Sequence, residues 1–181
     1  QLTTLEGCPK EVGGNFNCNH NQLTTLEGCP KEVGDSFYCN DNLLTTLEGS
    51  PKKVGEHFIC NKNKLTTLKG CTEEVGGGFS CLLNELISLE GGPKKVGSFF
   101  DCSSNKLTSL EGYPKELDGY FECWRNPIEN IYNLFGSLKE FQDSMDYGYL
   151  RGTDIIKLRF KEALEEIGVK LPKEIKGYNY I

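Results

Sequence analysis

Cysteine is the residue type of this 181-residue chain with the widest capacity for chemistry, and the chain holds nine of them. Thiolates ligate zinc and act as nucleophiles, and pairs of thiols form disulfides. Six of the nine recur at one position every 21 residues: Cys18, Cys39, Cys60, Cys81, Cys102 and Cys123. The other three, Cys8, Cys29 and Cys71, share a position with Ser50, Gly92 and Tyr113. What these thiols can do therefore depends on how the repeat arranges them.

Other groupings of catalytic residues do not stand out. His20 and His57 are the only histidines, and they occupy different positions of the repeat. The chain contains no P-loop, dinucleotide-binding, zinc-protease or G-x-S-x-G motif. A column of glutamates, interrupted by Lys69, runs beside lysines and indicates a solvated surface: Glu6, Glu27, Glu48, Glu90 and Glu111. We predict no catalytic residue, no metal site and no cofactor, so the chain is not expected to be an enzyme.

The element that positions all these residues is a 21-residue repeat, present six times without insertion or deletion. Leucine marks it at Leu2, Leu23, Leu44, Leu65, Leu86 and Leu107, and Ile128 closes the series. Phenylalanine marks it at Phe16, Phe37, Phe58, Phe79, Phe100 and Phe121, and asparagine at Asn21, Asn42, Asn63, Asn84, Asn105 and Asn126. A fixed period of this length is typical of a solenoid, in which each coil stacks only on its neighbours.

Each coil contains the string F-x-C-x-x-N-x-L-x-x-L. It resembles the leucine-rich-repeat consensus L-x-x-L-x-L-x-x-N-x-L, with Phe and Cys at the two strand positions. The resemblance implies a parallel sheet on a concave face. Pro and Gly in the other half, L-T-T-L-E-G-x-P-K-x-V-G, predict turns and extended chain without helix on the back of residues 1–126.

The residue sequence of the repeat and the later segment N-L-F-G-S-L-K-E-F resemble the sequences of leucine-rich-repeat proteins encoded by tailed bacteriophages. This resemblance covers essentially the whole chain. It implies a host protein as the partner, with a defence component as one candidate. It would also place the protein in the cytoplasm of an infected cell.

In-register parallel strands hold the six inward cysteines side by side, about 4.8 Å apart and pointing the same way. A disulfide needs Cβ atoms about 3.8 Å apart with suitable vectors, and zinc needs four converging ligands. A row of parallel thiols offers neither, so we expect them to pack as small apolar groups in a reducing, cytoplasmic setting. Of the other three, Cys8 and Cys29 are the first pair to test for oxidation.

Residues 127–181 lose the period and are predicted to form a helical C-terminal cap. Asn126 followed by Pro127 predicts a helix to Phe135. A second is expected from Ser137 to near Gly148, and a third from Thr153 or Asp154 to Gly168, with the tail extended. A cap would cover the apolar end of the last coil. The alternative is a second functional module with its own ligand.

Composition restricts the partners. The net charge is −6, which disfavours nucleic acid because phosphates need basic side chains. No run approaches the roughly 20 apolar residues of a membrane span. We expect a monomer or weak homo-oligomer. The chain opens at Gln1, within a repeat, and we expect residues to be missing upstream.

Binding residues should lie on the concave sheet face, at outward positions that the repeat leaves free on both sides of each Phe and Cys. In the first coil these are polar: Asn15, Asn17, Asn19 and His20. From the second coil onward large apolar and charged side chains replace them, as at interaction sites. The predicted binding residues are Tyr38, His57, Ile59, Leu82, Leu83, Phe99, Asp101, Tyr120, Glu122, Trp124 and Arg125.

The favoured function is therefore a non-catalytic protein-binding module. One alternative is sequestration of a small molecule or nucleotide between the last repeat and the cap, near Trp124 and Arg125. A lesser alternative is a structural or ice-binding solenoid, suggested by Thr-Thr pairs in four coils. It is also possible for some outward side chains merely to cover neighbouring coils, or for the cap to cover Trp124.

Overall fold

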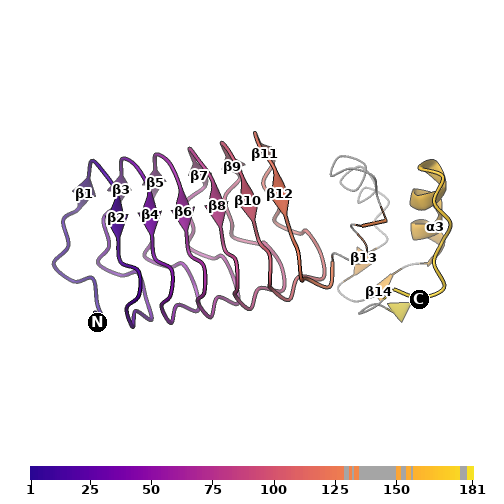
Figure 1. Ribbon diagram of the computed structural model, residues 1–181, viewed down its shortest axis with the longest axis horizontal. Helices are drawn as coiled ribbons and strands as arrows, with labels where there is room; N and C mark the ends of the chain where they lie inside the picture. The colour runs from indigo at the N-terminus through magenta and orange to yellow at the C-terminus, as the bar shows by residue number, and fades with distance from the viewer. Residues whose placement is uncertain (129–130, 132, 135–149, 152–153, 156, 176–178) are drawn as a thin grey trace.

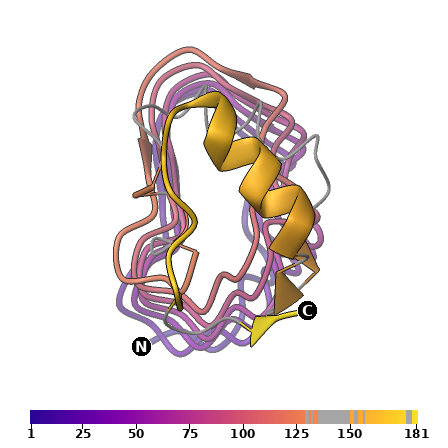
Figure 2. The same cartoon turned by 90° about the vertical axis from the view of Figure 1, so that its right-hand side faces the viewer.

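The computed structural model describes residues 1–128, 131, 133–134, 150–151, 154–155, 157–175 and 179–181. The repeat forms coils of 21 residues that stack in a row along the long axis (Figure 1). We number them from coil 1 (residues 1–21) to coil 6 (residues 106–126). Seen along the row, the coils superpose as one oblong ring (Figure 2). The chain is thus a parallel β-solenoid, as the period predicts.

Two parallel sheets run along the solenoid, each with one strand from every coil. The first, which we call the Phe sheet, consists of β2 (Phe16–Asn17), β4 (Phe37–Tyr38), β6 (Phe58–Ile59), β8 (Phe79–Ser80), β10 (Phe100–Asp101) and β12 (Phe121–Glu122). The second, the Val sheet, consists of β1 (Glu11–Val12), β3 (Glu32–Val33), β5 (Lys53–Val54), β7 (Glu74–Val75), β9 (Lys95–Val96) and β11 (Glu116–Leu117).

The Phe sheet is the one that the sequence predicts, whereas the Val sheet is additional. Where turns and extended chain were expected, Val33 pairs with Val54 in the same register as Phe37 with Phe58. Because every coil has the same length, extended segments at the same position lie side by side and complete their backbone hydrogen bonds with one another.

The core lies between the two sheets and consists of columns of identical residues. The Phe rings contact one another from coil to coil in tilted pairs, with centroids 5.0 Å apart for Phe37–Phe58 and 5.2 Å for Phe79–Phe100. The leucine columns are fully buried beside them, as at Leu44 and Leu65. Each coil therefore supplies the packing partner of the next, which is why a single coil has no core of its own.

The buried asparagines join neighbouring coils. The amide nitrogen of Asn42 donates to the backbone oxygens of Cys18 in coil 1 and Cys39 in coil 2, at 3.0 and 3.2 Å. Its Oδ1 accepts from the backbone N–H of Leu23 at 3.0 Å. Asn84 and Asn105 repeat the arrangement. The buried amide groups are thus satisfied by the backbone that they turn.

The Thr-Thr-Leu-Glu-Gly segment makes a tight turn. The hydroxyl of Thr46 accepts from the backbone N–H of Glu48 at 3.3 Å, and Gly49 has a φ of 89°. A Cβ at Gly49 would lie 2.6 Å from the backbone nitrogen of Glu27, so both conformation and space require glycine. The second threonine of the pair is therefore engaged in the turn, which leaves one threonine row for the surface.

Helix α3 (Lys157–Glu166) lies beyond β12 and crosses the open end of the coils (Figures 1 and 2). Its Phe160, Ala163 and Leu164 are buried in the same apolar cluster as the solenoid core. Gly168 follows it with a φ of 72°, as a helix end requires.

The start predicted for this helix was wrong, because Asp154 belongs to a small sheet. Strand β14 (Asp154–Ile155) pairs antiparallel with β13 (Leu150–Arg151) and parallel with β15 (Asn179–Tyr180). Within the first predicted helix, Ile131 is helical and the other described residues form turns, with N–H···O bonds from Ile131 to Ile128 and from Leu134 to Ile131. The second, from Ser137 to Gly148, lies outside the described residues.

Candidate functional site

The six inward cysteines are buried free thiols, and four of them lie within hydrogen-bond distance of a backbone oxygen of the next coil, namely Cys18, Cys60, Cys81 and Cys102. The Sγ of Cys60 lies 3.3 Å from the backbone oxygen of Ser80, and that of Cys102 lies 3.3 Å from that of Glu122. Burial raises the pKa of Cys18 to about 12 and that of Cys60 well above its usual value. A nucleophile or metal ligand needs the thiolate, so this environment disfavours both roles.

The second cysteine column forms a hydrogen bond that serine also supplies. The Sγ of Cys29 lies 3.1 Å from the backbone oxygen of Gly49, and in the next coil the Oγ of Ser50 lies 2.7 Å from that of Gly70. Exchange of Cys for Ser thus keeps a donor between coils. Among the described residues no group of His, Cys, Asp or Glu is arranged to hold a metal ion.

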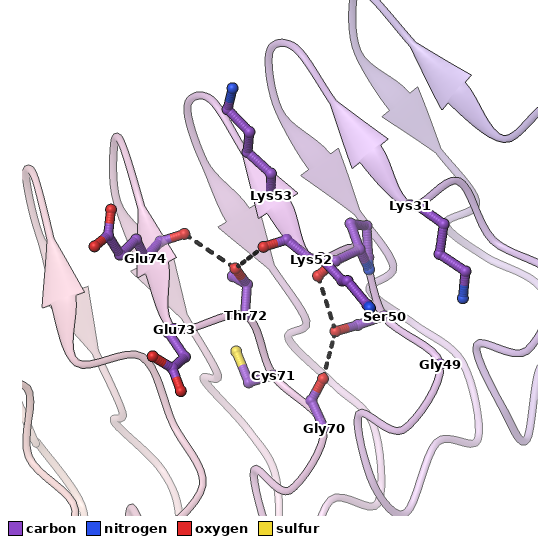
Figure 3. A pocket seen from close by; sticks show the side chains of 11 residues that line it. Lys31, Gly49, Ser50, Lys52, Lys53, Gly70, Cys71, Thr72, Glu73 and Glu74 are labelled. Carbon is purple, nitrogen blue, oxygen red and sulfur yellow. Dashed lines mark hydrogen bonds between the residues drawn. The ribbon is translucent and has the colours of Figure 1, made fainter.

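A hollow of about 700 Å³ lies beside the starts of strands β3, β5 and β7 of the Val sheet, in coils 2 to 4 (Figure 3). Its charged side chains are Lys31, Lys52, Lys53, Glu73 and Glu74. The hydroxyl of Thr72 donates a hydrogen bond to the backbone oxygen of Lys52 at 2.8 Å, and the hydroxyl of Ser50 donates one to the backbone oxygen of Gly70. The hollow therefore has mixed charge and no hydroxyl left to orient a ligand.

The predicted binding residues all lie on the outer side of the Phe sheet or on the turn that follows it. We call this surface the outer face. Tyr38 and Ile59 are in-register neighbours on β4 and β6. Seven of the predicted residues are half-buried: Tyr38, His57, Ile59, Leu82, Phe99, Asp101 and Glu122. Four are exposed, namely Leu83 at 43%, Tyr120 at 58%, Trp124 at 54%, and Arg125.

Three aromatic rings form a row on this face. Tyr120 stacks on Phe99, with ring centroids 5.6 Å apart and planes at 16°. The ring of Phe99 extends over Gly78 of coil 4 and meets the imidazole of His57, again with centroids 5.6 Å apart. A Cβ at Gly78 would collide with the Phe99 ring. Gly78 therefore determines where the row lies.

His57 also has a structural role that its sequence position did not reveal. Its Nδ1 accepts a hydrogen bond from the backbone N–H of Gly78 at 2.8 Å. In the same column Ser36 Oγ accepts from the His57 N–H at 3.2 Å, and Asn15 Oδ1 accepts from the Ser36 N–H at 3.0 Å. Each side chain thus satisfies a backbone donor of the next coil, and the neutral imidazole with its proton on Nε2 fits this arrangement.

Leu83 has an unusual backbone conformation. It belongs to a column in which every residue has a left-handed φ, and its own is 58°. The equivalent residues are His20, Asp41, Lys62, Ser104 and Arg125. Such a φ is uncommon for a bulky apolar side chain and costs free energy. Leu83 therefore combines an unfavourable backbone conformation with an exposed apolar side chain.

The charges of the outer face fall into two groups. Asp41 has basic partners in both adjacent coils, with His20 at 3.6 Å and Lys62 at 3.8 Å. Asp101 and Glu122 are instead in-register neighbours on β10 and β12. Within the described part of the chain, neither of these two carboxylates forms an ion pair.

Sequence reasoning missed Gly78 and Ser80 as residues of this site. The Oγ of Ser80 lies 2.7 Å from Asn61 Oδ1 and 3.4 Å from Asp101 Oδ2, which links coils 3 to 5 on the outer face. The sequence did contain an indication for Gly78. It is the only glycine at its position of the repeat, and the equivalent residue of the next coil is Phe99.

These features define a parallel β-solenoid of 21-residue coils with an aromatic and partly acidic outer face. No protein-family model, curated protein or solved structure matches the chain. None of the described helices has the length and apolar character to cross a bilayer. The two hollows described, at coils 2 to 4 and around Lys161 to Leu171, are lined by neither Trp124 nor Arg125.

Proposed function

We propose that the protein is a non-catalytic binding module that contacts another protein through its outer face. The observation that carries the proposal is the run of apolar side chains from Tyr38 to Trp124 at positions where coil 1 has asparagine. Small polar residues satisfy the fold at these positions, as Asn17 and Asn19 do. Exposed apolar surface is unfavourable in water and commonly marks an interaction site.

The composition of the surface supports the same function. Tyr120 and Trp124 are more than half exposed, and these two residue types dominate interface energetics. The row of His57, Phe99 and Tyr120 is held by ring stacking and by the backbone of Gly78. Rings held before binding lose less entropy when the partner arrives.

We further propose that the repeat belongs to the leucine-rich-repeat class, on the string F-x-C-x-x-N-x-L-x-x-L. If the chain is encoded by a phage, the partner is a host protein met in the cytoplasm. The free thiols fit that compartment, since a reducing medium keeps buried cysteines unpaired.

The test compares proteins captured by the wild type with those captured by three variants. Trp124→Ala and Leu82→Ala should each lose the captured partner, and Asn17→Ala should retain it. Binding of the recovered partner is then measured by calorimetry, where a hot-spot truncation costs about 2 kcal/mol or more. Equal binding by all four proteins, with folding verified by circular dichroism, would place the contact elsewhere.

A further inference from the structure

We infer that the partner inserts a basic side chain, arginine or lysine, against Glu122 and Asp101 between the rings of Tyr120 and Trp124. The inference rests on the proposed function and specifies the chemistry of its partner. Tyr120, Glu122 and Trp124 alternate with the inward Phe121 and Cys123. Alternate residues of an extended segment share a face, so an acidic group lies between two aromatic ones.

The position of Trp124 follows from its column. Its equivalent in coil 3 is Asn61, whose Oδ1 accepts from Ser80 Oγ on the outer face. The backbone N–H of Trp124 is bound by Ser103 Oγ at 3.2 Å, which fixes the chain at this point. The indole is 54% exposed and accessible to a partner.

The two carboxylates have no cationic partner among the described residues. Several other charges in adjacent coils are paired, as in Glu48–Lys69 at 2.9 Å and Glu85–Lys106 at 2.8 Å, although Glu11 and Glu32 of the Val sheet are a second in-register pair of like charges. On the outer face Asp41 lies between His20 and Lys62. Asp101 and Glu122 are the only in-register pair of like charges among the outward residues of the Phe sheet. Like charges opposite each other disfavour folding.

A cation relieves this repulsion, and the surrounding rings select an organic one. Arginine and lysine bind over the faces of tryptophan and tyrosine. Arginine also forms paired hydrogen bonds with a carboxylate. Asp101 Oδ1 accepts a hydrogen bond from the Ser103 N–H at 2.9 Å, which orients its carboxylate. Arg125 lies in the adjoining column, beyond Trp124.

The test begins with a displayed library of random 12-residue peptides selected on the full chain. Trp124 is the only tryptophan, so its fluorescence reports on binding of each synthetic peptide at this position. We expect enriched peptides to contain arginine or lysine. Replacement of that residue by glutamine should weaken binding at least tenfold. The double variant Asp101→Asn, Glu122→Gln should weaken it equally, and Glu32→Gln on the Val sheet should not.

The outcomes separate the two proposals. If enriched peptides lack basic residues, or bind the double variant as well as the wild type, the inference is wrong. If such peptides still need Leu82 and Trp124, the outer face remains the binding surface. Calorimetry measures binding to Trp124→Ala, which has no tryptophan. Peptides that bind Trp124→Ala and Leu82→Ala unchanged would contradict both proposals. Failure to enrich any peptide would overturn the inference of a basic peptide segment.

Discussion

The rings of His57 and Phe99 lie 5.6 Å apart, between centroids, although they belong to coils 3 and 5. Equivalent backbone positions two coils apart in a parallel stack are separated by about 9.6 Å. The contact exists because the residue between them is Gly78, over which the Phe99 ring leans. A residue without a side chain therefore shapes the surface that we propose for binding.

Gly78→Ala should displace the Phe99 ring and weaken partner binding several-fold. The fold should tolerate the change, because the colliding atoms belong to a side chain that can move outward, and Gly78 has no left-handed φ. We expect a stability change within about 1 kcal/mol. The measurements are binding calorimetry and urea unfolding. Gly14→Ala is the matched control, since a Cβ there makes only an ordinary contact with Asp35. Unchanged binding by Gly78→Ala would show that the aromatic row is dispensable.

Leu83→Asn should stabilise the protein while weakening binding. Asparagine tolerates the left-handed φ of 58° better than leucine, and the gain should be about 0.5–1 kcal/mol. The binding loss follows from removing an exposed apolar side chain. Thermal unfolding and calorimetry measure the two effects. Ser104→Asn, at the same position in coil 5, is the control for conformation alone. A destabilised Leu83→Asn would mean that the leucine contributes to packing.

Cys39→Ser should cost more stability than Cys60→Ser. Both thiols are fully buried, but Cys60 lies 3.3 Å from the backbone oxygen of Ser80. No side-chain hydrogen bond of Cys39 is formed with a described residue. A serine hydroxyl at position 60 finds an acceptor, whereas at position 39 it is desolvated without one. We expect about 1–3 kcal/mol for Cys39→Ser and about 1 kcal/mol or less for Cys60→Ser. Urea unfolding of both variants measures the two losses of stability. Equal losses would contradict the hydrogen bond assigned to Cys60.

The free energy of unfolding should fall as the pH rises above about 9. Burial raises the thiol pKa of Cys18 and Cys29 from 9.0 to about 12, and it raises the pKa of Cys60 and Cys102 well above the usual value. Above the unfolded pKa the unfolded chain loses protons that the folded chain keeps, so ionisation favours unfolding. Each thiol contributes a slope of up to about 1.4 kcal/mol per pH unit.

Urea unfolding between pH 8 and 10.5 measures this slope. Replacing both Cys60 and Cys102 by alanine should reduce the slope by up to about twice the contribution of one thiol. The double substitution also lowers stability at neutral pH. An identical slope in the double variant would show that these thiols ionise as readily in the folded state as in the unfolded one.

Much of the fold follows from the sequence alone. Six repeats of equal length force equivalent residues into register, so Phe, Cys, Asn and Leu form columns whatever the details. The alignment of the asparagines and of the inward thiols in columns follows from the same rule, and the structure confirms both columns. The Val sheet was missed because a two-residue strand with one buried side chain leaves no alternation to read.

The helix start at Asp154 was misplaced for a related reason. Asp154 has the local preference of an N-cap, but Ile155 pairs with Tyr180, far along the chain. Pairing between distant segments overrides a local preference for helix initiation.

For the proposed binding surface, the sequence by itself determined which residues point outward, because the repeat assigns a direction to every position. Only the tertiary structure decided how those side chains meet. It showed that Phe99 reaches His57, that Asp41 lies beside His20 and Lys62, and that Asp101 and Glu122 are adjacent without a cation among the described residues. These relationships depend on side-chain distances between coils, to which a fixed 21-residue period gives direction and spacing but not conformation.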